Sequence, residues 1–193
     1  MITKTKRAKR KKNPVLESEV NKVLDKLNPE YVFYLAEGDY SEVYEFKINE
    51  NKEIDGVVLK KGIYAIKFLR QNNYLDSKDI TYLKKLSRLK VIPKIYIITK
   101  KYIVMDFIKG DTLKQRLYKM EHPGKKERLI MTLEKMIQNL HDKGIAHGDL
   151  HFGNVMIDEE DNMYLIDPNT DSKDFESDEN RLYFQRQVHL DGL

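Results

Sequence analysis

The sequence predicts an α+β fold with two lobes, an antiparallel sheet in the first half and helices in the second. Aromatic and β-branched segments dominate residues 31–107, which is typical of strands. From residue 112 onward the longest pattern is an amphipathic helix. At 193 residues and 40% hydrophobic composition, the chain can bury one core or two small lobes that share a core. It is too short for two ordinary independent domains.

Two helices and six strands are predicted in the first half. Residues 15–27 have apolar positions at helical spacing, and Asn28-Pro29 ends that helix. The second helix is 77–89, with Ser77 as its predicted N-cap. The predicted strands are two within 31–48 joined by a turn at Gly38, a short one at 57–59, then 63–69, 95–99 and 102–107.

The second half is predicted to hold a short helix, a long helix and a hairpin. The long amphipathic helix spans 125–143, and Gly144 ends it. The short helix is 112–120, and the hairpin strands are 155–157 and 163–166, around a polar turn.

Charge is unevenly distributed along the chain. Residues 1–12 hold seven of the basic residues and no acid, so the net charge of +4 becomes −3 without them. Residues 158–179 hold ten acids and one lysine. We therefore predict a disordered basic arm at 1–13 and one folded domain at 14–193. The overall pI is not evidence for a basic nucleic-acid-binding face on the fold.

Composition excludes several classes of protein. Without cysteine, the chain has no disulfide scaffold, thiol nucleophile or cysteine-ligated metal. No run of about 18 apolar residues is present, so we expect no membrane span, and the basic start is not followed by the apolar run of a secretory signal. We expect a cytoplasmic protein, with nuclear import through the basic arm as a second location.

Three polar residues carry the strongest chemical signal. Asp149 and Asn154 follow the long helix, and Asp167 ends the second hairpin strand. The hairpin folds its far end back, which brings Asp167 near Asn154. Two carboxylates and an amide oxygen then converge, a set of hard oxygen ligands suited to Mg²⁺ together with phosphate oxygens.

The motifs around these residues resemble the protein-kinase-like superfamily. Five segments carry the resemblance in the family's order over residues 31–169: Ala36–Val43 (a degraded glycine-rich loop, with Ala36 and Ser41 at glycine positions), Tyr64–Lys67, Val104–Gly110, His147–Asn154 and Asp167–Asn169. Any one of these segments is a weak signal, whereas five in order are a strong one.

The resemblance implies phosphoryl transfer from ATP with Mg²⁺. Lys67 holds the α- and β-phosphates, and Asn154 and Asp167 hold the metal. Asp149 orients the acceptor hydroxyl and accepts its proton, while Gly38 lets backbone amides approach the phosphates. The implied lobes are about 14–105 and 110–193, joined by a hinge at 106–109, with ATP in the cleft between 31–105 and 109–169.

Further ATP-site residues follow from the same resemblance. Val43 and Ala65 come from the strands that cover the nucleotide, and Met105, Asp106 and Ile108 come from the lobe junction. The partner of Lys67 is predicted to be Asp79, with Asp76 as its rival. Both acids are equally explained as ordinary charges at a helix N-terminus.

Simpler structural roles stand beside several assignments. Lys67 alone could be a charge on an edge strand, and Asp149 and Asn154 could cap turns. We expect His147 to be structural, bonding to backbone near the loop. His151 occupies the position where many protein kinases carry lysine, and two roles stay open for it: contact with the transferred phosphate, or packing.

Three departures from the family pattern shape the prediction. Gly148 replaces an arginine that binds phosphorylated activation segments, so we expect no such switch. Pro168-Asn169 favours a fixed metal-binding triplet. Only 26 residues follow Asp167, so we predict a truncated helical C-lobe, resembling the small KEOPS kinase, RIO-type kinases or compact bacterial effector kinases. Apolar surface on the long helix is then covered by a partner protein or by the tail 182–190.

Three functions are compatible with these features. The first is a minimal Ser/Thr protein kinase that acts on a protein substrate. The second is a small-molecule phosphotransferase of the aminoglycoside- or choline-kinase type, which His151 favours. The third is a non-catalytic interaction module. The basic arm at 1–12 would bind RNA or an acidic partner, or would only aid solubility.

Overall fold

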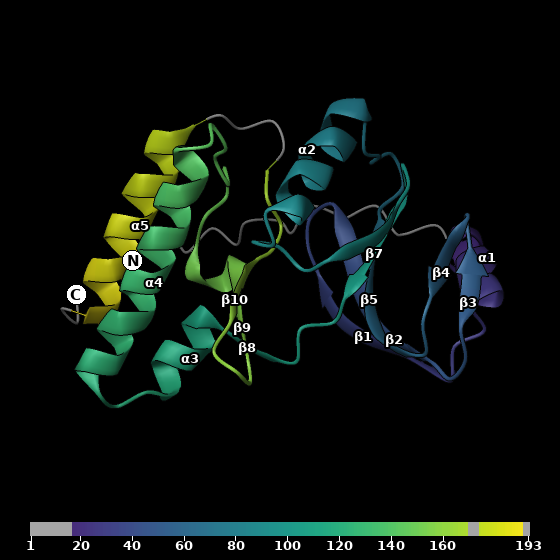
Figure 1. Cartoon of the computed structure of the whole chain (residues 1–193), viewed down its shortest axis with the longest axis horizontal. Helices are drawn as coiled ribbons and strands as arrows, with labels where there is room; N and C mark the ends of the chain where they lie inside the picture. The colour runs from purple at the N-terminus through teal and green to yellow at the C-terminus, as the bar shows by residue number, and fades with distance from the viewer. Residues whose placement is uncertain (1–16, 170–173, 191–193) are drawn as a thin grey trace, which may run out of the picture. The chain divides into compact units, whose positions relative to one another are not determined.

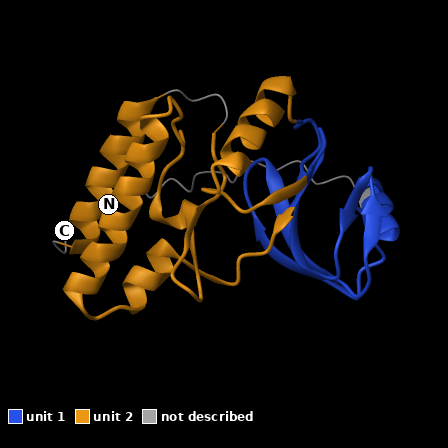
Figure 2. Ribbon diagram, in the orientation of Figure 1, with its two compact units in different colours: residues 1–74, 97–104 blue, residues 75–96, 105–193 orange. Residues whose placement is uncertain are grey.

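The computed structural model describes residues 17–169 and 174–190 (Figure 1). The predicted basic arm and the first two residues of the predicted helix 15–27 lie outside the described residues. The chain divides into two compact units, residues 1–74 with 97–104, and residues 75–96 with 105–193 (Figure 2). Residues 75–96, which we had grouped with the first lobe, belong to the second unit. The predicted α+β class is confirmed.

The largest sheet has five strands in the order β1-β2-β5-β7-β6. β1 and β2 form an antiparallel hairpin with a register shift between Tyr34 and Ala36, and β2 also pairs antiparallel with β5. Both strands of the hairpin were predicted from their aromatic and β-branched residues. Its strands are β1 (Tyr31–Glu37), β2 (Ser41–Ile48), β5 (Gly62–Leu69), β6 (Ile95–Ile98) and β7 (Tyr102–Asp106). Each predicted strand of this sheet is present, with ends within one residue of the prediction.

The rest of the first unit is helix α1 (Glu17–Leu27) and a small hairpin of β3 (Lys52–Ile54) and β4 (Val57–Leu59). β4 is the short strand expected at 57–59, whereas β3 was not predicted because its sequence is mostly charged. The turn between them is Asp55-Gly56, and both residues have positive φ, which is what a tight two-residue hairpin requires.

The second unit combines helices with a three-stranded sheet of order β10-β9-β8. Its elements are α2 (Ser77–Arg88), β8 (Gly110–Thr112), α3 (Leu113–Lys119), α4 (Pro123–His141), a 3₁₀ turn at Phe152–Asn154, β9 (Val155–Asp158), β10 (Met163–Leu165) and α5 (Phe175–Leu190). The short helix, the long helix and the β9–β10 hairpin were predicted. β8 and α5 were not.

Two predicted helix starts are corrected. The N-cap of α2 is Asp76 and not Ser77, because the Asp76 carboxylate accepts hydrogen bonds from the backbone N–H groups of Lys78 and Asp79. α4 begins at Pro123, two residues earlier than predicted, since proline suits the first helical position.

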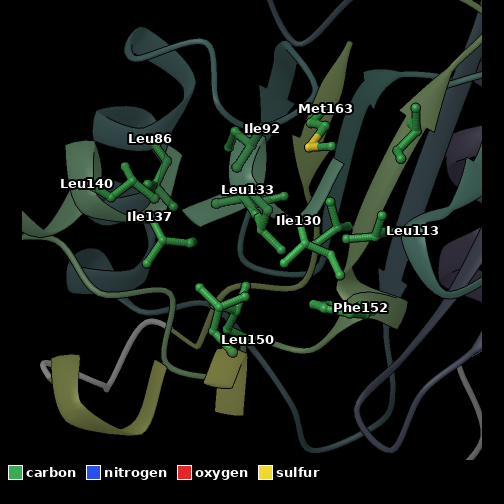
Figure 3. Packing of buried hydrophobic residues seen from close by; sticks show 14 of the residues in the cluster. Leu86, Ile92, Leu113, Ile130, Leu133, Ile137, Leu140, Leu150, Phe152 and Met163 are labelled. Carbon is green, nitrogen blue, oxygen red and sulfur yellow. The ribbon is translucent and has the colours of Figure 1, made fainter. Parts of the chain in front are cut away.

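One hydrophobic cluster holds the second unit together (Figure 3). α4 contributes Ile130, Leu133, Ile137 and Leu140, and all four are almost fully buried. α5 packs along α4, where Leu182 joins the cluster and Arg186 pairs with Glu134 at 2.7 Å. Of the two expected covers for the long helix, the tail therefore supplies one. Among the described residues, none of the helices has the length and apolar character that crossing a membrane requires.

Candidate active site

The loop from His147 to Asn154 follows the end of α4, and a glycine with positive φ lies before it and another within it. Gly144 and Gly148 both have positive φ, at 67° and 77°. Gly144 stops the helix, as predicted. At Gly148 the chain turns back in a conformation that an arginine side chain would strain. The glycine that departs from the regulated-kinase pattern therefore has a local structural cause.

His147 is a buried structural residue, as expected from the sequence. Its side chain is 1% exposed, and its Nε2 lies 3.0 Å from the carbonyl oxygen of Ile166. Its Nδ1 accepts a hydrogen bond from the Asp149 N–H at 3.4 Å. This pair of partners requires the neutral ring with the proton on Nε2, and burial lowers the pKa of His147 in agreement.

Asp149 and Asn154 contact each other directly. The Asn154 side-chain nitrogen donates to the Asp149 backbone oxygen at 2.9 Å and to its carboxylate Oδ2 at 3.2 Å. Both bonds use the amide nitrogen, so the amide oxygen is the atom of Asn154 that can bind a metal. Asn154 is 7% exposed, and its position is set by the 3₁₀ turn that it ends.

Asp167 reaches this loop through the predicted hairpin. Leu165 lies opposite Val155, and the Ile166 N–H donates to the Asn154 carbonyl at 2.9 Å. Asp167 follows immediately and adopts a left-handed conformation with φ of 55°. This conformation is less favourable for residues other than glycine, although aspartate adopts it more readily than most, as Asp55 does in the β3–β4 turn. It turns the chain sharply at the residue that we predicted to bind metal.

Sequence reasoning missed a buried acid, Asp178, in the first turn of α5. Its side chain is fully buried, and its two oxygens accept hydrogen bonds from the backbone N–H groups of His147 at 2.6 Å and Gly148 at 2.9 Å. His141 of α4 also lies 3.3 Å from it. Asp178 fixes the start of the loop, and no motif in the sequence marked it.

Tyr82 of α2 ties a second helix to the same loop. Its hydroxyl donates to the carbonyl oxygen of Ala146. Burial, with a smaller contribution from the Asp178 charge, raises the pKa of Tyr82 to about 12, so the phenol remains protonated and remains a donor at neutral pH.

His151 has a local bonding role in this structure. Its Nδ1 accepts a hydrogen bond from the Gly153 N–H at 3.1 Å, which caps the 3₁₀ turn before Asn154. This cap is a structural role for His151, and its contact with the transferred phosphate stays a prediction.

The oxygen ligands of the loop fit a hard divalent cation. Asn154 offers an amide oxygen and Asp167 a carboxylate, and Mg²⁺ sites commonly use one or two protein oxygens with phosphate oxygens and water. Within 17–169 and 174–190, no group of three or more His, Asp or Glu side chains could hold a metal by itself. Asn154 and Asp167 are residues of this site that could contribute oxygen ligands to such a cation.

In the first unit, the turn that contains Gly38 is held by a backbone hydrogen bond and by contacts of Arg70. The Gly38 N–H donates to the Ser41 carbonyl at 2.9 Å. Arg70, only 3% exposed, reaches Glu37 at 2.7 Å, Glu42 at 2.8 Å and the Gly38 carbonyl at 3.3 Å. Glu37 and Glu42 face each other across β1 and β2, and their like charges would repel without Arg70.

Lys67 and the residues predicted around it lie on regular elements. Lys67 is half-buried on β5, opposite Val43 of β2, and Ala65 is buried on the same strand. Neither a lysine-to-nucleotide contact nor the choice between its two acidic partners is tested, so those assignments stay predictions.

The two acids predicted as partners of Lys67 form a capping box at α2. Asp76 accepts from the N–H groups of the first turn, and the Asp79 carboxylate accepts from the Asp76 N–H at 2.9 Å. Both acids therefore have the structural role expected of charges at a helix N-terminus.

At the predicted hinge, Met105 and Ile108 are half-buried. The Asp106 carboxylate accepts from the Tyr96 hydroxyl at 2.7 Å, and its N–H donates to the Lys94 carbonyl at 2.9 Å. These contacts fix the backbone of Asp106. The adenine contacts of this segment remain a prediction.

The fold and the loop define a protein-kinase-like domain. Residues 40–189 match the family model described as the RIO domain, and the chain belongs to the RIO-domain family. This membership agrees with the resemblance to RIO-type kinases found in the sequence.

Relatives with curated names match shorter stretches. The chain is 40% identical over 67 residues to the KEOPS complex subunit Bud32 of Pyrococcus abyssi, covering 34% of this chain and 29% of that protein. It is 34% identical over 68 residues to the EKC/KEOPS complex subunit bud32 of Dictyostelium discoideum, covering 33% and 27%.

A longer but more divergent match is to the hormonally up-regulated neu tumor-associated kinase of Homo sapiens. The identity is 28% over 122 residues, which cover 60% of this chain and 16% of that protein. The matched stretches are thus under a third of each relative's length. Membership of the RIO-domain family and the match to a named kinase support a kinase-type phosphotransferase.

Proposed function

We propose that this chain is an ATP- and Mg²⁺-dependent kinase that transfers the γ-phosphate to a hydroxyl group of a protein. The observation that carries the proposal is the pairing of Asp149 with Asn154, followed by Asp167 in a left-handed conformation beside the same loop. Phosphoryl transfer depends mainly on positioning and charge neutralisation, and this loop would supply the positioning and the ligands for a neutralising metal.

Asp149 is the residue we assign to the acceptor. A carboxylate has about four acceptor positions on its two oxygens. In the described structure one oxygen bonds to Asn154 and the other to Arg181, so lone pairs remain for an incoming hydroxyl. Asp149 would orient this hydroxyl toward the phosphorus atom and take its proton as the new bond forms.

Asn154 and Asp167 are the residues we assign to the metal. The Asn154 amide oxygen and the Asp167 carboxylate would hold Mg²⁺, which when bound neutralises charge on the phosphate oxygens. Asn154 is held by Asp149, so the two roles are geometrically linked. Lys67 and the turn at Gly38 are assigned to the phosphates of the nucleotide.

A protein acceptor and a protein partner are the finer parts of this proposal. Two of the relatives are named as subunits of KEOPS complexes, which motivates a search for a stable protein partner. The His151 ring is engaged as a cap, which weakens the argument that favoured a small-molecule acceptor.

Incubation of the purified chain with radiolabelled ATP and Mg²⁺ tests the proposal. It is run alone, with generic protein acceptors and with small hydroxyl compounds. Label on protein supports a protein kinase, label only on small compounds supports the second function, and no label in any arm supports the interaction module.

Two variants and one control test the residue roles. Asp149→Ala should lower turnover by about 10³-fold or more with nucleotide binding retained. Asp167→Ala should also weaken metal-dependent nucleotide binding. Asp142→Ala is the control, because Asp142 is an exposed residue at the end of α4 that bonds to Gln138. Wild-type activity in Asp149→Ala would contradict the assignment.

A further inference from the structure

One face of α5 lies along the loop from His147 to Phe152 and contacts it at four residues, His147, Gly148, Asp149 and Phe152. The four residues that form this face, which we call the loop-facing stripe, are Asp178, Arg181, Gln185 and His189. They are spaced by three, four and four positions, so they share one side of the helix.

Each member of the stripe has a defined partner. Asp178 accepts from the N–H groups at the start of the loop. Gln185 accepts from the Phe152 N–H at 2.6 Å, and the His189 ring stacks on the Phe152 ring with centroids 5.2 Å apart. Both ends of the loop are therefore fixed to α5 on either side of Asp149.

Arg181 occupies the middle of the stripe and contacts the Asp149 side chain. Its Nη1 lies 2.5 Å from Asp149 Oδ1, while Oδ2 of the same carboxylate bonds to Asn154. The carboxylate is thus held at both oxygens, by a cation from α5 and by an amide from the loop. A charge-assisted bond of this kind restrains rotation of a side chain.

We propose that Arg181 is a positioning residue for Asp149, holding its carboxylate in the orientation that receives the acceptor hydroxyl. This inference rests on the proposed function. It also assigns a cation next to the proposed base, where many protein kinases have a lysine and this chain has His151, whose ring caps a turn instead.

Exposure of the pair makes a chemical test feasible. The side chains of Arg181 and Asp149 are each 45% exposed, so a small guanidinium ion can reach the space left by a truncated arginine. A purely structural arginine would not be replaced by a free ion, because a packing defect needs the whole side chain.

The experiment compares Arg181→Ala, Arg181→Lys and Arg181→Gln with Arg186→Ala. Arg186 is the matched control, because it lies on the same helix and pairs with Glu134 and Glu127 of α4. The measurements are kcat, KM for ATP and the unfolding temperature, each with and without millimolar guanidinium. The lysine and glutamine variants keep the test valid if the alanine variant does not fold.

Arg181→Ala should lower kcat roughly 10- to 100-fold, the scale expected when a reacting group is misplaced by about 1 Å, with KM for ATP changed by less than about twofold. Arg181→Lys should retain part of kcat, guanidinium should restore part of it to Arg181→Ala, and Arg186→Ala should keep it.

An unchanged or increased kcat in Arg181→Ala overturns the inference. The inference is also overturned if Arg181→Ala and Arg186→Ala lose kcat equally, each in proportion to its drop in unfolding temperature. If Asp149→Ala is inactive in the same assay, the proposed function stands while this inference fails. If wild type shows no Asp149-dependent turnover, the proposed function itself fails.

Discussion

Substitution of Asp178 should destabilise the second unit more than any other single polar substitution near the loop. The carboxylate is fully buried and accepts hydrogen bonds from two backbone N–H groups. In Asp178→Ala both donors lose their partner in a site that water reaches poorly. Each unsatisfied buried group costs about 1–3 kcal/mol, so the expected loss is about 2–6 kcal/mol, a large part of a typical stability of about 5–15 kcal/mol.

Glu179→Ala is the matched control for this substitution. Glu179 is the next residue on α5, its side chain is 63% exposed, and it lies 3.4 Å from the same histidine, His141. Because the Glu179 side chain is mostly in solvent, its contact with the nearly buried His141 should contribute about 0–1 kcal/mol. Urea unfolding of wild type and both variants gives the difference in the free energy of unfolding.

Hydrogen exchange locates the effect at the two amides themselves. The N–H groups of His147 and Gly148 should exchange faster in Asp178→Ala and at wild-type rates in Glu179→Ala. The reasoning is refuted if the two variants lose similar stability, or if these two amides keep their protection without the carboxylate.

Three other predictions concern single residues. Because burial lowers the pKa of His147, the unfolded chain binds more protons there, so stability should fall as pH drops below the ordinary value of about 6.5; urea unfolding of wild type and His147→Gln from pH 7.5 to 5 should show a shallower dependence in the variant. In Gly110→Ala the new Cβ would lie 1.9 Å from the Ile157 carbonyl oxygen, so thermal unfolding should show a loss of about 1–3 kcal/mol, larger than in Gly62→Ala, where the nearest atom, from Tyr64, would lie at an ordinary contact distance of 3.6 Å. Arg70→Met should cost about 1–3 kcal/mol and raise KM for ATP in steady-state kinetics, whereas an unchanged KM would show that the turn at Gly38 is not part of the nucleotide site.

Elements with a strong local pattern were predictable from the sequence. The strands of the large sheet carry alternating aromatic and β-branched residues, and the long helix has apolar residues at helical spacing, so periodicity alone located them. The strands that were missed are very short. β3 and β8 are three-residue strands with the mostly polar sequences KEI and GDT, so no apolar run marks them as VVL marks the equally short β4. They exist because a neighbouring strand pairs with them.

The missed helix α5 has a different cause. Its apolar residues are not gathered on one face; Tyr183 and Phe184 are each 67% exposed, while Leu182 is buried. The face that packs inward is largely polar, because it meets backbone N–H groups and a carboxylate instead of apolar side chains. A search for an apolar stripe cannot find a helix whose loop-facing side contains the buried Asp178 and the half-exposed Arg181.

The candidate site was predictable only as far as its residues are close in sequence. Asp149 and Asn154 are five positions apart, and a single hairpin brings in Asp167, so the turn pattern was sufficient to expect their convergence. Asp178 and Arg181 contact the same loop from 30 and 32 positions further along the chain. Nothing in local spacing specifies such a contact.

The loop from His147 to Asn154 presents backbone N–H groups and a carboxylate to the helix that supports it, and this requirement explains the composition of α5. An apolar helix face would leave the N–H groups of His147, Gly148 and Phe152 without acceptors, at about 1–3 kcal/mol each. The support must therefore offer acceptors and a cation at helical spacing, which Asp178, Arg181 and Gln185 do. A polar stripe of this kind, with an acid, a base and an amide at positions one, four and eight, is the pattern to seek downstream of a loop that has the His-Gly-Asp motif.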